Sequence, residues 1–466
     1  MDQFPTWLVN TVTALGFTIP TVAYFWVIAH FGVNLLFADQ LTDVDTISAS
    51  KTQVIPWGTL WAPHNHNRML FPHLLDIALA DTVHFNTKFE AFLSAILLVA
   101  ATAFLILAHK RRSPRTPWLY YCPVAVLSLS LVQYQSTLWG FQIAWYMVLF
   151  AIALAIFLID RITLSTWALI GAIAAGVVGS YSLLQGLFIW PIGLILLYHR
   201  RRGWPAFVAW IGSALATGVL YLLPHNPGSD GNGYALQHPW ASFKFFLFAI
   251  GDVVGVLVKP GGNNSNVILF GIVILALAAF AVICYGLRRD EHGAGPIGVA
   301  LIVCGLLFAA SVTQGRGYWG YWGASASRYT TFDLLIPIGI YLCVLGKPSI
   351  RVRWQNGSKA EDGAPVSVDT SPILDGRSPD LVLRAIRWVV AVVIVTQIVV
   401  GLGNAVTPIR ATHQIQLAAV RLSRHPDQSS ALELTHVAPF FSASYIRQQL
   451  HTAEKLHISL FYPPSG

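Results

Sequence analysis

Long apolar runs separated by short polar segments recur along most of the chain. Because a membrane-spanning helix needs roughly 20 apolar residues, these runs predict about eleven spans. The pattern therefore predicts an all-α fold, a polytopic membrane helical bundle. The predicted spans lie near residues 17–37, 90–108, 118–134, 138–158, 164–183, 184–198, 204–223, 266–287, 294–313, 330–346 and 383–404.

The composition indicates a membrane protein as well. Of the 466 residues, 55% are hydrophobic and 11% are charged, and the mean hydropathy is +0.59. A soluble domain carries about 25% charged residues, so this chain has too few to cover a water-facing surface. A net charge of +8 would suit nucleic acid. The arginines, however, stand in short clusters between apolar runs, which is typical of cytoplasmic loops, and we expect no nucleic-acid partner.

The basic clusters predict the orientation. Cytoplasmic loops are enriched in Lys and Arg, and the clusters lie at 109–112, 199–202, 288–289 and 347–353. A cytoplasmic N-terminus places all of them inside and places the C-terminus outside. Counting the apolar segment 243–258 as a full span would move the third cluster outside. We therefore interpret that segment as re-entrant or interfacial.

This orientation places the unusual polar segments on one face. We predict a transmembrane domain over residues 1–404 and an extracytoplasmic helical tail over residues 405–466 that forms a small C-terminal cap. Residues 347–382 are rich in Gly, Ser and Pro, which predicts a flexible cytoplasmic linker. The first outer loop covers residues 38–89. Further outer polar segments lie at 133–142, 224–265 and 313–330.

The first outer loop opens with acids. Asp39 follows the first span directly, and Asp43 and Asp45 come just after it. An ionisable group at a membrane boundary is costly unless it is paired or hydrated, so a catalytic role is one interpretation. The other is that these acids simply face water beyond the helix end.

A dense polar group follows at His64-Asn65-His66-Asn67-Arg68. His-x-His can ligate a divalent metal, but no further ligands are apparent in the sequence, so His64 and His66 are weak metal candidates. They and Asn65 are also candidates for binding substrate. The guanidinium of Arg68 matches phosphate oxygens and keeps its charge, which makes it a candidate phosphate ligand.

Two later outer segments combine polar and aromatic side chains. Gln135, Trp139 and Gln142 suit recognition of a sugar or a polar headgroup, although an aromatic belt explains Trp139 equally well. In the second segment, Arg316 and Arg328 lie on the face that the positive-inside bias disfavours. An anionic ligand would explain both arginines, with Tyr329 beside them. The alternative is structural pairing with Asp39, Asp43 or Asp333.

Together these segments resemble the GT-C superfamily of membrane glycosyltransferases, and most closely a group of largely uncharacterised bacterial multi-pass proteins. The matching residues are Asp39 with Asp43, then 64–68, Trp139-Gly140-Phe141-Gln142 and Ser327-Arg328-Tyr329. Where the group usually has Glu followed by His, this sequence has His66-Asn67. The acid of that element is missing, which puts its role here in doubt.

The resemblance implies a GT-C-like bundle in the bacterial inner membrane. It also implies inverting transfer of a sugar from a polyprenyl-phosphate donor to an extracytoplasmic glycan, lipid or protein acceptor. Asp39, with Asp43 beside it, would be the catalytic carboxylate and act as general base on the acceptor hydroxyl, and Arg68, Arg328 and Arg316 would hold the phosphate. A divalent metal is the one cofactor candidate, and membrane lipid is an expected partner. The alternative function is a transporter or flippase for a lipid-linked or polar substrate.

Overall fold

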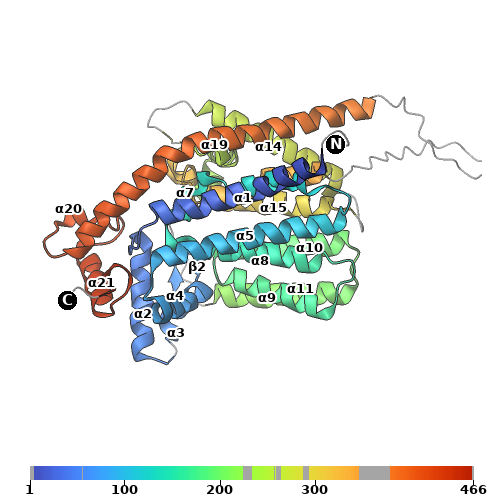
Figure 1. Ribbon diagram of the computed structural model, residues 1–466. Helices are drawn as coiled ribbons and strands as arrows, with labels where there is room; N and C mark the ends of the chain where they lie inside the picture. The colour runs from blue at the N-terminus through green and yellow to red at the C-terminus, as the bar shows by residue number, and fades with distance from the viewer. Residues whose placement is uncertain are drawn as a thin grey trace, which may run out of the picture.

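The computed structural model describes residues 5–54, 56–223, 233–256, 258, 264–286, 293–345 and 378–463. Within these residues the chain is helical apart from one two-stranded hairpin, and the long helices lie side by side in a bundle (Figure 1). Seven of them are long and apolar enough to cross a membrane. The predicted all-α membrane bundle is therefore confirmed at this coarser level. Of the predicted linker at 347–382, residues 347–377 lie outside the described residues.

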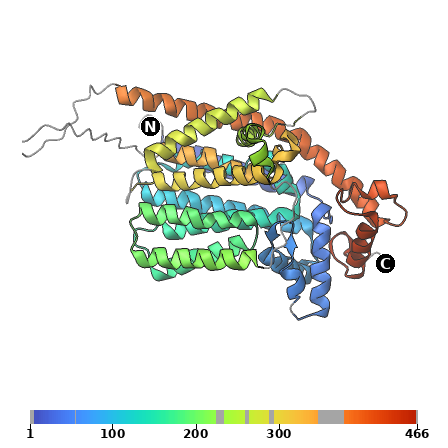
Figure 2. The same cartoon turned by 180° about the vertical axis from the view of Figure 1, so that it is seen from behind.

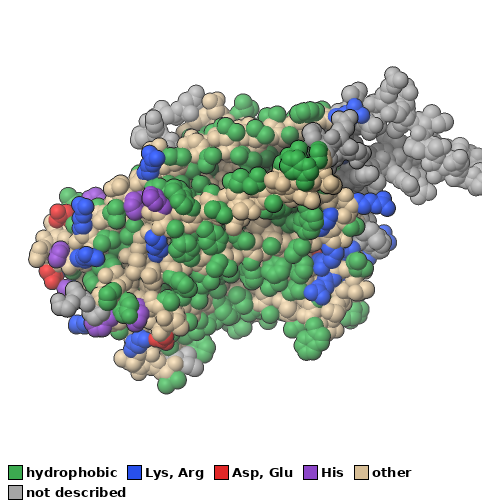
Figure 3. All heavy atoms as spheres, viewed as in Figure 1, with side chains coloured by type: hydrophobic (Ala, Val, Ile, Leu, Met, Phe, Trp, Pro, Cys, Tyr) green, Lys and Arg blue, Asp and Glu red, His purple; other side chains and the backbone are tan. Residues whose placement is uncertain are grey.

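In the described part of the chain, eleven helices form the bundle and its edge. The face seen in Figure 3 is covered by hydrophobic side chains along its middle, while charged side chains gather toward its two ends. The helices are α1 (Thr6–Phe31), α5 (Thr87–Arg112), α8 (Ile143–Ile159), α9 (Thr166–Ser180), α10 (Ile189–His199), α11 (Trp204–Leu222), α13 (Pro239–Gly251), α14 (Ser265–Ala281), α15 (Gly295–Arg316), α18 (Leu335–Leu345) and α19 (Ser378–Arg424).

Three predicted spans form helices shorter than a usual span. They are 166–180, 184–199 and 330–345, which include α9, α10 and α18. The predicted number of eleven spans stays a prediction for that reason. The segment 243–258, which we interpret as re-entrant or interfacial, contains most of α13 and the 3₁₀ turn η6 (Asp252–Val254).

The predicted span at 118–134 is not one helix. It divides into η2 (Trp118–Tyr121), α6 (Cys122–Ser128), η3 (Leu131–Gln133) and the start of α7 (Tyr134–Leu138). At the break, Gln133 Nε2 donates to the Ser128 carbonyl at 2.7 Å, and Gln397 Nε2 donates to Ser130 Oγ at 3.0 Å. Buried amide side chains thus satisfy polar groups that a broken helix would leave open, which lets the break lie inside the bundle.

The first outer loop folds against the end of the bundle where α5 begins. It contains η1 (Ala38–Thr42), α2 (Asp43–Thr52), α3 (Trp57–Leu60), the hairpin strands β1 (Pro63–His64) and β2 (Asn67–Arg68), and α4 (Leu70–Val83). Helix α5 then starts sharply, because the Asn86 side chain accepts hydrogen bonds from the backbone N–H groups of Lys88 and Phe89, each at 3.1 Å.

The predicted domain boundary at residue 404 lies inside α19. This helix has 47 residues, so it extends for about 70 Å, more than twice the hydrocarbon thickness of a bilayer. It follows the bundle and continues past it to the tail (Figures 1 and 2). The helix ends at Arg424, immediately before His425-Pro426. The tail continues with α20 (Ala431–Leu434), α21 (Ala443–Lys455) and η9 (Ser459–Phe461).

The tail and the first outer loop share a second hydrophobic core. Buried members include Leu41 and Ile47 from the loop and Leu434, Ile446 and Leu450 from the tail. Polar contacts join the same elements, because Tyr445 Oη and Gln449 Nε2 donate to the two carboxylate oxygens of Asp45 at 2.9 and 2.8 Å. The tail therefore fixes the position of the loop that carries the early acids.

Candidate functional site

A cavity of about 380 Å³ lies where the first outer loop meets the end of the bundle. Its lining comes from η1, the β1–β2 hairpin, the start of α8, the end of α15 and the turn before α17 (Thr330–Asp333). These elements lie far apart in the sequence. The predicted site residues among its lining are Asp39, His64, Asn65, His66, Trp139, Gln142, Arg316, Arg328 and Tyr329.

Asp39 lies on η1, and its backbone is fixed from two sides. Ala38 adopts a positive φ of 52°, and its N–H donates to the Val437 carbonyl of the tail at 2.9 Å. From the other side, Trp139 Nε1 donates to the Phe37 carbonyl at 3.1 Å. The Asp39 side chain remains 31% exposed, so it can meet a substrate in the cavity.

His64 lies beside Asp39 at the end of β1. The pairing of Pro63 with Arg68 and of His64 with Asn67 leaves Asn65 and His66 as a two-residue turn, with Asn65 at a φ of 54°. His64 Nε2 is 3.9 Å from Asp39 Oδ2, and its ring lies 5.4 Å from the Phe141 ring, centre to centre. The hairpin therefore presents an imidazole to the carboxylate.

Arg316 and Arg328 supply the positive charge of the cavity. The Arg316 guanidinium lies over the Trp319 ring at 4.3 Å, and that of Arg328 lies 5.2 Å from the Tyr329 ring centre. In the described part of the chain neither arginine forms an ion pair with an acid. The structural pairing considered from the sequence is therefore not observed there.

Gln135 does not line the cavity, although the sequence made it a substrate-binding candidate. Its N–H donates to Ser327 Oγ at 2.9 Å, and its Oε1 accepts from the Arg328 N–H at 3.4 Å. Gln135 thus holds the turn that presents Arg328.

Arg68 is also absent from the cavity lining, in contrast to its expected phosphate contact. Its side chain is buried, with the guanidinium 5.4 Å from the centre of the Trp61 ring. The guanidinium donates to the backbone carbonyls of Trp61, Tyr221 and Leu223 at 2.5, 3.5 and 3.4 Å. In this conformation Arg68 joins the hairpin to the end of α11.

Asp43 is buried behind the cavity and does not line it. Its Oδ1 lies 4.0 Å from His73 Nε2. Burial and the neighbouring carboxyls raise its pKa well above 3.8, and burial raises the pKa of Asp76 as well. Burial, with a smaller effect of His64, lowers the pKa of His73 to about 4.

Three buried ionisable residues near the cavity were not predicted from the sequence: His73, Asp76 and Glu90. Glu90 accepts a 2.7 Å hydrogen bond from Gln40 Nε2, next to Asp39 in the chain. The available signal was an acid inside an apolar stretch: Asp76 follows His73 by three residues on one helix, and Glu90 begins an apolar run.

Two amides lining the cavity have buried acceptor atoms. Gln142 Oε1 and Gln185 Oε1 find no hydrogen-bond partner among the described residues. An acceptor without a partner in a buried position is costly, and a ligand hydroxyl would satisfy it. Aromatic rings of Trp139, Trp145 and Trp319 complete the wall, which suits a ring-shaped polar ligand with several hydroxyls.

The residues described include no group of three or more His, Cys, Asp or Glu side chains placed to hold a metal ion. Metal binding by His64 and His66 therefore stays a prediction from the sequence.

Comparison of the chain with protein-family models, curated proteins and solved structures found no match. In the cavity, one carboxylate, two imidazoles and two guanidinium groups meet among aromatic rings.

Proposed function

We propose that this protein transfers a sugar from a lipid-phosphate donor to an acceptor hydroxyl in the cavity. The main support is that Asp39 lines the same cavity as Arg316 and Arg328. A reaction in which a hydroxyl loses its proton while a phosphate departs needs both kinds of group. A polyprenyl phosphate would bring its phosphate to the membrane interface, which in this proposal lies at the level of Arg316, where α15 ends.

In the proposed reaction, the acceptor oxygen attacks the anomeric carbon while the bond from that carbon to the phosphate oxygen breaks. Asp39 takes the hydroxyl proton, as a general base must lie within hydrogen-bond reach of it. The bonding electrons leave with the phosphate, and Arg316 and Arg328 offset its growing negative charge. Attack opposite to the leaving group inverts the anomeric centre.

His64 would act as a positioning residue in this scheme. Its Nε2 lies 3.9 Å from Asp39 Oδ2, too far for a hydrogen bond but close enough for the ring to limit the orientations of the carboxylate. Gln142 and Gln185 would accept hydrogen bonds from sugar hydroxyls. Asp43 and Arg68 have no direct part in this scheme because neither lines the cavity.

The test is replacement of Asp39 by Asn, which keeps the shape of the side chain and removes its basicity. Loss of a general base typically lowers the rate by about 100-fold or more. Transfer would be measured with a polyprenyl-phosphate sugar and membranes that contain the purified protein. The matched control is Asp81→Asn, because Asp81 is an exposed acid of the same loop that pairs with Lys51.

Full transfer by the Asp39→Asn variant would remove this carboxylate from the mechanism. Donor binding by the wild type, with donor moved across the bilayer and no product formed, would instead favour the transporter or flippase.

A further inference from the structure

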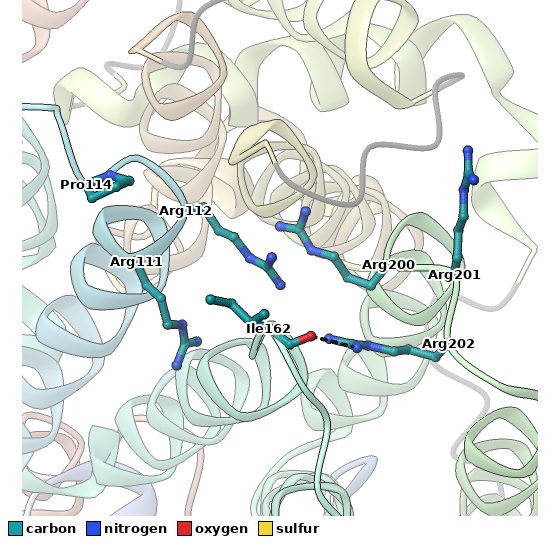
Figure 4. Close-up of a pocket in the computed structure, with 7 residues that line it drawn as sticks. All are labelled: Arg111, Arg112, Pro114, Ile162, Arg200, Arg201 and Arg202. Carbon is teal, nitrogen blue, oxygen red and sulfur yellow. Dashed lines mark hydrogen bonds between the residues drawn. The ribbon is translucent and has the colours of Figure 1, made fainter.

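A second cavity lies at the opposite end of the bundle, where α5, α8 and α10 finish. It has a volume of about 420 Å³ and is lined by Arg111, Arg112 and Arg200 through Arg202, with Pro114 and Ile162 (Figure 4). We call it the arginine cavity. The residues of the proposed transfer site take no part in it, so the inference below is independent of that proposal.

The centre of the arginine cavity is built on one buried acid. Asp160 follows α8 directly and is fully buried. Its two carboxylate oxygens accept from Arg112 Nε at 3.0 Å and from Arg200 Nε at 2.5 Å. In Figure 4 the two arginines extend toward each other from opposite sides. Their guanidinium groups are thus held in place before any ligand arrives.

Two more arginines are fixed at the sides of the cavity by backbone carbonyls. Arg111 donates to the Phe157 carbonyl at 2.7 Å and lies over the Phe157 ring at 4.6 Å. Arg202 donates to the Ile162 carbonyl at 3.1 Å. Five arginines thus surround one space. The arrangement presents planar donors of fixed direction to one space.

The surroundings place this cavity at the level of lipid headgroups. Trp204, which follows Arg202 by two residues, is 74% exposed, and Trp167 at the start of α9 is 82% exposed. Ile162, which lines the cavity, is 71% exposed. Exposed Trp side chains typically mark the interface between hydrocarbon and headgroups. An anion that reaches this cavity most readily is therefore the phosphate of a lipid.

We propose that the arginine cavity binds a phosphate group, supplied by the headgroup of an anionic phospholipid. Paired guanidinium forks match phosphate oxygens in a way that a lysine ammonium does not. Basic pockets between membrane helices are suited to such headgroups. The competing explanation is that these arginines only orient the protein in the membrane, for which charge suffices and geometry does not matter.

The experiment compares the wild type with the double variant Arg111→Lys, Arg202→Lys. Both substitutions keep the charge and remove the fork, while Arg112, Arg200 and Asp160 stay intact. The dissociation constant for phosphatidylglycerol would be measured on the purified full-length protein in detergent, with phosphatidylcholine as the zwitterionic comparison. We expect binding of phosphatidylglycerol to weaken about tenfold in the variant.

The matched control is Arg115→Lys, since Arg115 is exposed at the same end and does not line the cavity. Its affinity should equal that of the wild type. Inorganic phosphate forms a further arm of the experiment. Binding of phosphate as tight as that of phosphatidylglycerol, lost in the same double variant, would support the phosphate site and identify a free anion as its source.

The proposal is overturned if the double variant binds phosphatidylglycerol as tightly as the wild type. Equal affinity of the wild type for phosphatidylglycerol and phosphatidylcholine would overturn it as well. Should the double variant fail to accumulate, the single variant Arg111→Lys permits the same comparison, because its carbonyl contact lies at the side of the cavity.

Discussion

Buried ionisable groups lie directly behind the candidate site. Asp43, His73 and Asp76 are all in the first outer loop, and burial disfavours their charged forms. The folded protein therefore keeps protons on the two carboxyls at pH values where the unfolded chain has released them. It also keeps His73 neutral where the unfolded chain would protonate it.

These shifts predict how stability depends on pH. As pH falls from 6.5 to about 4, protonation of the unfolded chain at His73 lowers stability. Above pH 6.5, His73 is neutral in both the folded and the unfolded state, so it no longer makes stability depend on pH. The two carboxyls act the other way, because their pKa values are raised from 3.8: the stability they contribute is present at low pH and is lost as pH rises through the raised values.

Replacement of Asp76 by Asn should therefore flatten the fall in stability at rising pH. Asn keeps the side-chain shape but has no proton to lose, and removal of this acid also relieves Asp43. Each proton that differs between the two states changes stability by about 1.4 kcal/mol per pH unit. Thermal unfolding in detergent at several pH values measures the effect. Asp81→Asn, at an exposed acid, should keep the wild-type profile; identical profiles for all three proteins would refute the prediction.

Single side chains also show what the sequence could and could not predict. Arg68 and Arg328 looked alike in the sequence, since each is an arginine among aromatic residues of an outer segment. The structure separates them, because carbonyls of Trp61 and α11 surround the first and the second lines the cavity. Such carbonyls come from residues up to 155 positions away, so no local pattern reveals them.

At the scale of elements, the site depends on a close approach of η4 (Gly140–Gln142) to the first turn of α5. A Cβ at Gly140 would lie 2.5 Å from Glu90 Oε2 and 2.6 Å from the Thr87 carbonyl oxygen. Only glycine allows this approach without a shift of backbone. Trp139 and Gln142, which flank the contact, both line the cavity.

Gly140→Ala should therefore reduce both stability and donor binding. Forcing an extra methyl group into a packed contact typically costs about 1–3 kcal/mol, and the shift of η4 would displace Trp139. Thermal unfolding and donor affinity measure the two effects. The control is Gly212→Ala in α11, where a Cβ would meet nothing within 4 Å and alanine favours the helix. Equal behaviour of both variants would show that the approach is not required.

Elements were easier to predict from the sequence than their ends and breaks. Apolar runs located the long helices because burial in lipid or protein requires them to be apolar throughout. The same signal missed the break at Ser130, which depends on Gln133 and Gln397 from other parts of the chain. The apolar signal also placed the end of the last span at residue 404, because the part of α19 that follows is too polar to be predicted as a span.

At the scale of the whole molecule, the two cavities lie at opposite ends of the bundle, and α5 extends from one of these ends to the other. It has 26 residues and a length of about 39 Å, enough to cross a hydrocarbon core of about 30 Å. The first outer loop ends where α5 begins, and the basic residues His109 through Arg112 form its last turn. The positive-inside bias therefore predicts that the arginine cavity faces the cytoplasm and the candidate site faces outside.

Cysteine labelling tests this orientation with Asp81→Cys and Arg115→Cys. Both positions are exposed, and they flank α5 on its two sides. Each substitution is made separately in a variant that lacks the four native cysteines. In intact cells, a membrane-impermeant maleimide should label the protein with Asp81→Cys, while the one with Arg115→Cys should react only after permeabilisation. A permeant maleimide should label both, which controls for reactivity.

The labelling results distinguish a reversed orientation of the protein from an α5 that does not cross the membrane. Labelling of the Arg115→Cys protein alone in intact cells would reverse the orientation and place the candidate site in the cytoplasm, where the expected extracytoplasmic acceptor is absent. Labelling of both proteins from one side would instead mean that α5 does not cross the membrane. Helix α5 carries Glu90 at one end and Arg111 and Arg112 at the other. That result would therefore also mean that the membrane does not separate the two cavities, and their different roles depend on that separation.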